Sequence, residues 1–293
     1  MAVPLAIVTG ATGGLGFEAS LGLARAGHEV LMTGRDAGRG AAALARLQAA
    51  VPGAHARFAM LDTSRLASVA EFAAGIDRPV AVLLNNAGVM ALPTRELTED
   101  GFERQLGTNY LGHFALTLRL RERLRGGRAV MVASVAHRRG RIAFDDLQGA
   151  RNYSSWQAYA QSKLAMLMFA LELHRRSVGE GGGEGWGIHA TAAHPGWSAT
   201  RIVLNGPGGG LPSVKARIMQ AGFNALAQSA AAGALPLLYA ALDPAAQSGG
   251  YYGPCCWGET RGAPAPSRIM PQAADPVAQA RLWEASVALT GVT

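Results

Sequence analysis

The chain contains very little cysteine. Its 293 residues include two, Cys255 and Cys256, and these are adjacent. Adjacent cysteines favour neither an ordinary structural disulfide nor a metal site, which would need further ligands. The seven histidines are scattered, without the paired spacing typical of metal-binding helices. We therefore expect a reducing compartment and no metal.

The amino terminus lacks the features of a secretory signal. Met1 to Val8 leads directly into the run LAIVTG, without a basic region or a small-residue cleavage site. This predicts a cytoplasmic protein. Charged residues make up 16% of the chain and hydrophobic residues 49%, which is typical of a globular protein and excludes a disordered one.

One long segment carries no charge. Residues 218–242 contain no Asp, Glu, Lys or Arg and are numerous enough to span a bilayer. Polar residues and a proline interrupt the segment and would be costly in hydrocarbon: Gln220, Asn224, Gln228, Ser229 and Pro236. We expect no stable membrane insertion, and interpret the segment as two short buried or lid helices divided near Ser229.

Lysine is nearly absent. Lys163 and Lys215 are the only lysines among 27 basic residues. The formal net charge is +7, but the arginines are spread along the chain and interleaved with acids. We therefore expect no nucleic-acid partner, and an anionic small ligand fits the positive charge better.

The chain does contain a regular alternation of short apolar runs and longer helix-like stretches. The predicted strands are 5–9, 29–33, 56–60, 80–85, 129–134 and 188–194, with a last short strand suggested by SGGYYG at 248–253. The predicted helices include 15–26, 38–50, 66–74, 99–124 and 157–177. This alternation predicts an α/β fold with a Rossmann-like, doubly wound parallel sheet and helices on both faces. No interdomain linker appears, so residues 1–293 are expected to form one domain, with a substrate-loop region at about 197–228.

The first predicted strand runs into a glycine-rich loop, IVTGATGGLGFEA. Gly14, Gly16 and Ala19 match the GxGxxA fingerprint, and Gly10 and Gly13 add backbone freedom. Without side chains, backbone N–H groups and the positive end of a helix can approach a pyrophosphate closely. The loop therefore predicts a dinucleotide site, with an ordinary strand-to-helix turn as the alternative.

The spacing from Thr9 to Gly16 resembles the TGxxxGxG motif of the short-chain dehydrogenase/reductase family. Four further segments match that family in order: NNAG at 85–88, TNYLGHF with Asn109, Ser134 followed by the YxxxK pair, and HPGWSAT at 194–200. The resemblance covers nearly the whole chain. It implies about seven strands in the order 3-2-1-4-5-6-7.

The resemblance also implies roles for individual residues. The catalytic set would be Asn109, Ser134, Tyr159 and Lys163, with Asn109 holding a water that connects the lysine to solvent. The cofactor-binding set would be Gly10, Thr12, Gly13, Gly14, Leu15, Gly16, Arg35, Asp62, Thr63, Asn86, Ala87, Gly88, Tyr159, Lys163, Pro195, Gly196, Ser198 and Thr200. Within it, Asp62 resembles an acid that contacts adenine.

The YxxxK pair has a chemical reason of its own. Tyr159 and Lys163 are four residues apart, which places them on one face of a helix. An ammonium at ~4 Å in a dielectric of ~20 would favour the phenolate by about 4 kcal/mol, or roughly three pKa units, before desolvation opposes it. Tyr159 could then serve as a general acid/base for a carbonyl or an alcohol. Arginine would be bulkier in such a compact site.

The cofactor preference depends on the segment after the second strand, MTGRDAGR. Arg35 could pair with the extra phosphate of NADP, whereas Asp36 could bind an NAD ribose. NAD-dependent family members usually carry an acid where this chain has Gly34. We therefore predict that NADP(H) is preferred, with NAD(H) as the alternative, and that Asp36 caps the following helix.

Three histidines lie near these motifs. His113 and His194 fall inside family segments that are structural, so we do not expect either to transfer protons. For His137, three residues after Ser134, both a structural role and a proton-transfer role stay open.

The 24 residues between Ser134 and Tyr159 exceed the dozen usual in the family. The longer segment resembles that of the retinol dehydrogenase-like branch, which suggests a bulky, apolar alcohol, aldehyde or ketone. The alternatives are a double-bond reductase, an epimerase or a dehydratase on the same fold. A dinucleotide-binding protein without turnover is a further alternative.

The segment KLAMLMFALEL, which follows Tyr159, is apolar on nearly every face. We expect one side to cover the sheet and the other to meet a second subunit or the long insertion. Contact with a second subunit would make the protein a homodimer or a homotetramer.

Overall fold

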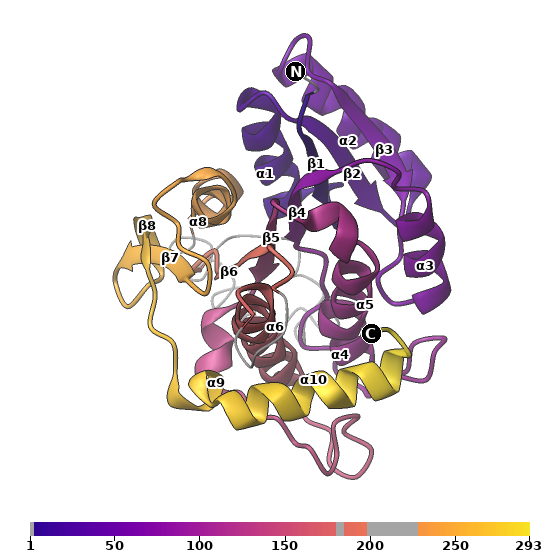
Figure 1. The fold of residues 1–293 in the computed structure, drawn as a ribbon, viewed down its shortest axis with the longest axis vertical. Helices are drawn as coiled ribbons and strands as arrows, with labels where there is room; N and C mark the ends of the chain where they lie inside the picture. The colour runs from indigo at the N-terminus through magenta and orange to yellow at the C-terminus, as the bar shows by residue number, and fades with distance from the viewer. Residues whose placement is uncertain (1–2, 180–184, 198–227) are drawn as a thin grey trace, which may run out of the picture.

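A computed structural model describes residues 3–179, 185–197 and 228–293. Its sheet has the strand order β3-β2-β1-β4-β5-β6-β7-β8 (Figure 1). The strands are β1 Leu5–Val8, β2 Glu29–Gly34, β3 Ala56–Met60, β4 Val80–Asn85, β5 Arg128–Val132, β6 His189–Ala193, β7 Tyr251–Cys256 and β8 Arg261–Pro266. The seven predicted strands pair in parallel, whereas β8 pairs antiparallel with β7. The predicted fold class and order are confirmed, and β8 is an addition.

Two apolar cores enclose the sheet, because successive side chains of a strand point to opposite faces. In β1, Ala6 and Val8 pack into one core, and Leu5 and Ile7 into the other. The first core includes α1 Gly14–Arg25, α2 Ala37–Ala50 and α8 Ala230–Leu242. The second includes α3 Leu66–Ala74, α5 Gly112–Arg119, α6 Ser155–Ser177 and α10 Pro276–Thr290.

Side-chain caps fix where two of these helices begin. The carboxylate of Asp36 accepts a hydrogen bond from the Arg39 backbone N–H at 2.8 Å, so Asp36 caps α2 as predicted. Asp275 caps α10 in the same way, and Pro276 occupies its first turn, where no backbone donor is needed. Gly291 ends α10 in the left-handed region.

The single helix predicted over 99–124 is wrong. The buried carboxylate of Glu103 accepts hydrogen bonds from the backbone N–H groups of Gln105 and Leu106, and helix α4 begins only after it. The chain then forms α4 Arg104–Leu106, a π-helical turn η1 Gly107–Leu111, α5, and a 3-10 turn η2 Arg121–Leu124. π-Helical turns are often found at functional sites, and this one contains Asn109.

Within the charge-free segment, a helix begins where the second of the two expected helices was placed. Ser229 accepts a hydrogen bond from the Ala232 backbone N–H at 3.1 Å and caps α8. The first of the two expected helices lies outside the described residues, as does most of the predicted substrate-loop region. Within the ranges that the structure describes, none of the helices is both long and apolar enough to cross a membrane.

The outer side of α6 is covered by the chain's own C-terminal helix. Trp283 on α10 packs edge-on against Phe114 at 5.0 Å between ring centroids, and against Phe169 of α6 at 5.8 Å. Figure 1 shows α10 crossing α6. The sequence did not suggest α10 as a covering element. The long insertion also packs on α6, as one of the two alternatives expected: the Gln161 side chain accepts a hydrogen bond from the Ala143 backbone N–H at 2.8 Å and donates one to the Leu147 carbonyl at 3.0 Å.

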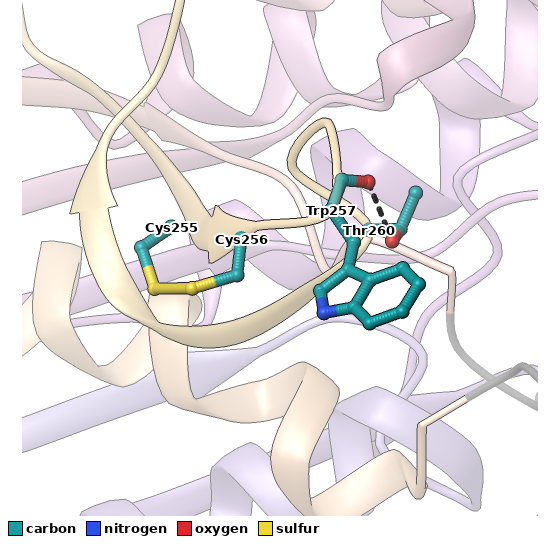
Figure 2. The surroundings of a disulfide bond; sticks show 4 residues. All are labelled: Cys255, Cys256, Trp257 and Thr260. Carbon is teal, nitrogen blue, oxygen red and sulfur yellow. Dashed lines mark hydrogen bonds between the residues drawn. A yellow bond between two sulfur atoms is a disulfide. The ribbon is translucent and has the colours of Figure 1, made fainter.

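The expectation that the adjacent cysteines would not form a disulfide is also wrong. The structure joins Cys255 and Cys256 at the end of β7 (Figure 2). Regular alternation would place neighbouring side chains on opposite faces of a strand. The register with β8 shifts between Pro254 and Cys256, and such an irregularity breaks that alternation.

Candidate dinucleotide and catalytic site

The glycine loop lies between β1 and the N-terminus of α1. Gly10 has φ +66°, and a Cβ atom there would lie 2.9 Å from Cα of Ala87. A Cβ on Gly16 would collide with the Gly10 carbonyl oxygen and with the Asn86 amide, whereas one on Gly13 would meet open space. Glycine is therefore required at two positions for the loop to pack against the chain after β4, and Gly13 leaves the outer side of the loop clear.

Thr9 holds the glycine loop and the NNAG segment together. Its hydroxyl oxygen accepts hydrogen bonds from the backbone N–H groups of Asn86 at 2.8 Å and Ala87 at 2.9 Å. The Asn86 side-chain amide returns a hydrogen bond to the Thr9 carbonyl at 2.8 Å. The predicted residues Gly10, Asn86 and Ala87 thus form one cradle at the carboxyl ends of β1 and β4.

His113 connects this cradle to Asn109. Its Nδ1 lies 2.8 Å from the Asn109 carbonyl oxygen, which is an acceptor, so Nδ1 carries the hydrogen. Burial lowers the pKa of His113 to about 4, so the ring is neutral and Nε2, 2.9 Å from the Thr9 hydroxyl, accepts a hydrogen bond from it. The expected structural role of His113 agrees with these contacts.

Ser134 and Tyr159 meet at the carboxyl end of β5. The Ser134 side chain lies beside the Tyr159 phenol, and Tyr159 is buried. Burial raises the pKa of Tyr159, and the contact with Ser134 opposes that rise. The upward direction differs from the lowering expected from the neighbouring lysine.

Lys163 lies beside Tyr159. Its ammonium donates a hydrogen bond to the Val132 carbonyl at 2.8 Å and lies 5.9 Å from the centre of the Tyr159 ring. Burial also lowers the pKa of Lys163 to about 8. The lysine is therefore beside the tyrosine as predicted, but desolvation outweighs its charge.

Asn109 is held by partners that the sequence did not identify. Its Oδ1 accepts from the Val89 backbone N–H at 2.8 Å, and its Nδ2 donates to the Val89 carbonyl and to the Ser162 hydroxyl, each at 2.9 Å. A Cβ atom on Gly88 would lie 3.0 Å from this Oδ1 and 3.8 Å from the Lys163 ammonium. Asn109 from the predicted catalytic set, Gly88 from the predicted cofactor-binding set and Lys163 from both thus lie side by side.

A cavity of about 280 Å³ lies beyond the ends of β2 and β3. Its lining residues are Arg35, Met60, Leu61, Asp62, Arg65, Ala67, Ser68 and Glu71. The Asp62 carboxylate accepts hydrogen bonds from the backbone and hydroxyl of Ser64, which fixes its orientation. Two of the predicted cofactor residues therefore share this cavity, and Arg65 is a second cation there that the motifs did not point to.

Close packing places the predicted cofactor residues Thr12 and Thr63. A Cβ atom on Gly34 would lie 2.9 Å from the Thr12 methyl group, so the glycine loop packs directly on the end of β2. Thr63 is buried, and its backbone oxygen presses against Gly112 of α5.

Pro195 and Gly196 follow β6, as expected of the PG segment. Gly196 has φ +65° and its N–H donates to Nδ1 of His194 at 3.1 Å. The Nε2 of His194 lies 3.1 Å from both the Glu259 carboxylate and the Ser267 hydroxyl. His194 therefore orders this segment, in line with a structural role. The predicted cofactor residues Ser198 and Thr200 lie outside the described residues.

His137 lies beneath Ser134. Its Nδ1 donates to the Ser134 carbonyl at 2.7 Å, and its ring packs edge-on against Tyr251 at 5.2 Å. Burial is the main reason that the pKa of His137 is lowered, so the ring is neutral at physiological pH. These contacts make His137 a support of the Ser134 backbone.

An aromatic residue that the motifs did not identify also contacts the site. The Trp156 indole stacks on the Tyr159 ring with 5.7 Å between centroids and 28° between planes. Trp156 is 60% exposed. It therefore offers an accessible apolar surface beside the tyrosine.

A family model described as short chain dehydrogenase matches residues 4–205, which is more than half of the chain.

Two curated relatives from Mus musculus illustrate the similarity. Retinol dehydrogenase 12 is 35% identical over 296 residues, covering 98% of this chain and 86% of that protein. Polyprenol dehydrogenase is 46% identical over 181 residues, covering 58% of this chain and 54% of that protein. The chain thus spans about half the length of the polyprenol dehydrogenase that it matches.

Among solved structures, an actinorhodin polyketide ketoreductase with NADPH aligns with a TM-score of 0.61 and 25% identity, covering 83% of this chain and 92% of that one. The family match, the relatives and the site geometry agree. The chain belongs to the short-chain dehydrogenase/reductase family of oxidoreductases, in its retinol dehydrogenase-like branch.

Proposed function

We propose that the protein is an NADP(H)-dependent oxidoreductase that interconverts a carbonyl and an alcohol on a bulky apolar substrate. The observation that carries the proposal is the contact between the Ser134 hydroxyl and the Tyr159 phenol, with the Lys163 ammonium beside them and the glycine cradle next to them.

The residues present fit a nicotinamide dinucleotide. The outer side of the glycine loop is clear of side chains at Gly13, and Gly13 is also the N-cap of α1. Backbone N–H groups at a helix N-terminus favour a pyrophosphate. Gly88 and Lys163 continue the path from the loop toward Tyr159.

Bound in this cradle, the nicotinamide supplies or accepts the hydride. Tyr159 gives its phenolic proton to the carbonyl oxygen of the substrate during reduction, and takes a proton from the alcohol during oxidation. Ser134 donates a hydrogen bond to the same oxygen and stabilises its developing charge. A protonated Lys163 favours the phenolate left on Tyr159 and then donates a proton that restores the phenol.

The preference for NADP(H) is supported by the cavity at the ends of β2 and β3. Arg35 lines it next to the glycine loop, and a guanidinium can bind a phosphate with two hydrogen bonds. Arg65 lines the same cavity, where an ion pair with Glu99 at 2.7 Å orients it. The ketoreductase structure with NADPH shows that the fold accommodates this cofactor.

The bulky apolar substrate is supported by Trp156 and by the names of two relatives, retinol dehydrogenase 12 and polyprenol dehydrogenase. Flat, accessible aromatic surfaces bind apolar groups, and Trp buries a large area when covered. We place the enzyme in the cytoplasm.

The test is NADPH oxidation measured across aliphatic, aryl, steroid and retinoid carbonyls, with product analysis. We expect reduction of at least one bulky carbonyl to its alcohol. Tyr159→Phe should lose about 10²–10⁴-fold in turnover while it still binds NADPH, because general acid–base catalysis contributes that much. A product saturated at a carbon–carbon double bond, or full activity in Tyr159→Phe, would contradict the proposal.

A further inference from the structure

We propose that the Cys255–Cys256 disulfide is a thiol–disulfide exchange site that sets how firmly the Pro195–Trp197 segment is held. The last step, an effect on dinucleotide binding, rests on the proposed function, whereas the exchange chemistry does not.

The two sulfurs lie at an accessible place. Cys255 and Cys256 are both exposed at the end of β7, and the next residue, Trp257, is 78% exposed at the tip of the β7–β8 hairpin (Figure 2). Thiol–disulfide exchange requires a thiolate to reach one of the sulfurs. A solution thiol can therefore attack this pair without unfolding the protein.

The opposite strand leaves space for the pair. Gly262 in β8 has φ +119°, and a Cβ atom there would lie 2.8 Å from Sγ of Cys255 and 3.1 Å from Sγ of Cys256. Any other residue at this position would push against both sulfurs. The hairpin thus has room for the disulfide because residue 262 is a glycine.

The hairpin turn beyond the pair is conformationally constrained. Trp257, Gly258 and Glu259 are consecutive residues with φ of 53°, 69° and 67°. Two of them are not glycine, and the left-handed region is unfavourable for such residues because of their side chains. Backbone of this kind persists only where its surroundings fix it.

The hydrogen bonds of Thr260 connect this turn to the segment that follows β6. The Thr260 N–H donates to the Cys256 carbonyl at 3.0 Å, and the Thr260 carbonyl accepts from the Trp197 N–H at 2.9 Å. A Cβ atom on Gly196 would collide with the same carbonyl. A short path of backbone hydrogen bonds therefore leads from Cys256 to the PG segment.

A second path runs through Glu259. Its carboxylate pairs with Arg138 at 2.7 Å and with His194 at 3.1 Å. Arg138 follows Ser134 in the turn η3 Val135–Arg139, and His194 holds the Gly196 N–H. A change in the conformation of the turn would therefore affect both η3, which follows Ser134, and the segment at Gly196.

The disulfide closes a small covalent ring that includes the peptide bond between the two cysteines. Breaking it frees the backbone at Cys256, whose carbonyl holds Thr260. Loss of this constraint allows the strained turn to relax, and the Thr260 carbonyl then holds the Trp197 N–H less often. A less ordered segment binds its ligand more weakly, because binding must then restore the order.

The exchange step is balanced with a dithiol as reductant. One thiolate of the dithiol attacks a cysteine sulfur and breaks the S–S bond, which leaves a mixed disulfide and one free cysteine thiolate. The second thiol of the reductant displaces the other cysteine. Two electrons and two protons are transferred, the reductant leaves as its own disulfide, and a small disulfide such as that of glutathione reverses the reaction.

The first experiment measures the thiols directly. The chain contains two cysteines in all, so titration with a chromogenic disulfide reports on this pair alone. After incubation with glutathione disulfide and removal of the reagent, the native protein should show no free thiol. After dithiothreitol, it should show two. Two thiols, or a stable glutathione adduct, in the oxidised sample would overturn the proposal.

Two glycine variants of the same hairpin test whether the disulfide needs the space at Gly262. Gly262→Ala should disfavour the disulfide, so that free thiols appear under oxidising conditions that leave none in the native protein. Gly258→Ala is the matched control, because Gly258 also has a positive φ, 69°, but its Cβ would meet no atom within 4 Å. Equal thiol counts in the two variants would show that the disulfide does not depend on a glycine at position 262.

The coupling is measured by hydrogen exchange of the peptide covering 192–197, compared between the oxidised and reduced forms. We expect about three- to tenfold faster exchange at Trp197 after reduction, and about three- to tenfold weaker NADPH binding by fluorescence titration. A variant with both cysteines changed to serine should resemble the reduced form and ignore dithiothreitol. Unchanged exchange on reduction would overturn the coupling. Faster exchange in a protein that binds NADPH in neither state would count against the proposed function alone.

Discussion

The Trp156 indole and the Tyr159 phenol ring stack at 5.7 Å between their centroids, and Trp156 keeps 60% of its surface exposed. The two residues are neighbours on α6, three positions apart, so the helix itself fixes their contact. Trp156 thus extends from the buried Tyr159 ring to the surface of the molecule.

We predict that Trp156→Ala raises the KM for a bulky apolar carbonyl by about tenfold, which corresponds to roughly 1.4 kcal/mol of lost contact. The KM for a small aldehyde should change much less, because it covers little of the indole. Steady-state kinetics on both substrates, with Trp156→Phe as the conservative control, provide the measurement. Equal losses on both substrates would point to a disturbed Tyr159 instead.

Lys163→Arg should lose about 10²-fold or more in turnover although the charge is kept. The Lys163 ammonium lies in a compact buried space between the Val132 carbonyl and Gly88, where the larger planar guanidinium does not fit in the same orientation. Turnover with saturating NADPH measures the effect. Exchange of the other lysine, Lys215→Arg, serves as the control, and a fully active Lys163→Arg enzyme would remove the lysine from the proposed mechanism.

Arg35→Ala should raise the KM for NADPH by about tenfold or more and leave the KM for NADH nearly unchanged, because only NADPH carries the additional phosphate. Arg65→Ala tests whether the second arginine of the same cavity shares this role. Kinetics with both cofactors decide the matter. An Arg35→Ala enzyme that uses the two cofactors as the native protein does would argue against NADP(H) recognition by this residue.

The buried ammonium of Lys163 also predicts a pH dependence of stability. Folding lowers its pKa from 10.5 to about 8, so the unfolded chain binds more protons between these two values. The contribution of Lys163 to the free energy of unfolding therefore rises with pH across this interval.

Urea unfolding of the native protein and of Lys163→Met, at about pH 7.5 and about pH 9.5, measures that contribution. Relative to the variant, the native protein should gain stability at the higher pH, since the methionine does not titrate. A constant difference between the two proteins would mean that the pKa of Lys163 is not lowered by folding.

Much of this molecule could be predicted from local sequence. The strand order and the helix cap at Asp36 agree with the expected pattern, because apolar runs and capping side chains act over a few residues. The family match confirms the membership that the glycine, NNAG and YxxxK motifs indicated. The grouping of Gly88, Asn109 and Lys163 in space agrees with those motifs as well.

Other features depend on contacts between distant segments. The helix expected from residue 99 begins only at Arg104, after Glu103, whose backbone N–H donates to the side-chain oxygen of the distant Gln148 at 2.7 Å. The disulfide forms at an irregularity that only the pairing of β7 with β8 reveals. The same is true of α10, whose Trp283 covers α6 from the far end of the chain.

The sequence by itself therefore determined the family and the order of the strands, because these depend on short-range patterns and motifs. Only the tertiary structure decided the protonation tendencies of Tyr159 and Lys163, since burial depends on every segment that packs around them. It also decided that the Cys255–Cys256 hairpin lies against the PG segment, because Thr260 and Trp197 are brought together by the sheet and not by the chain between them.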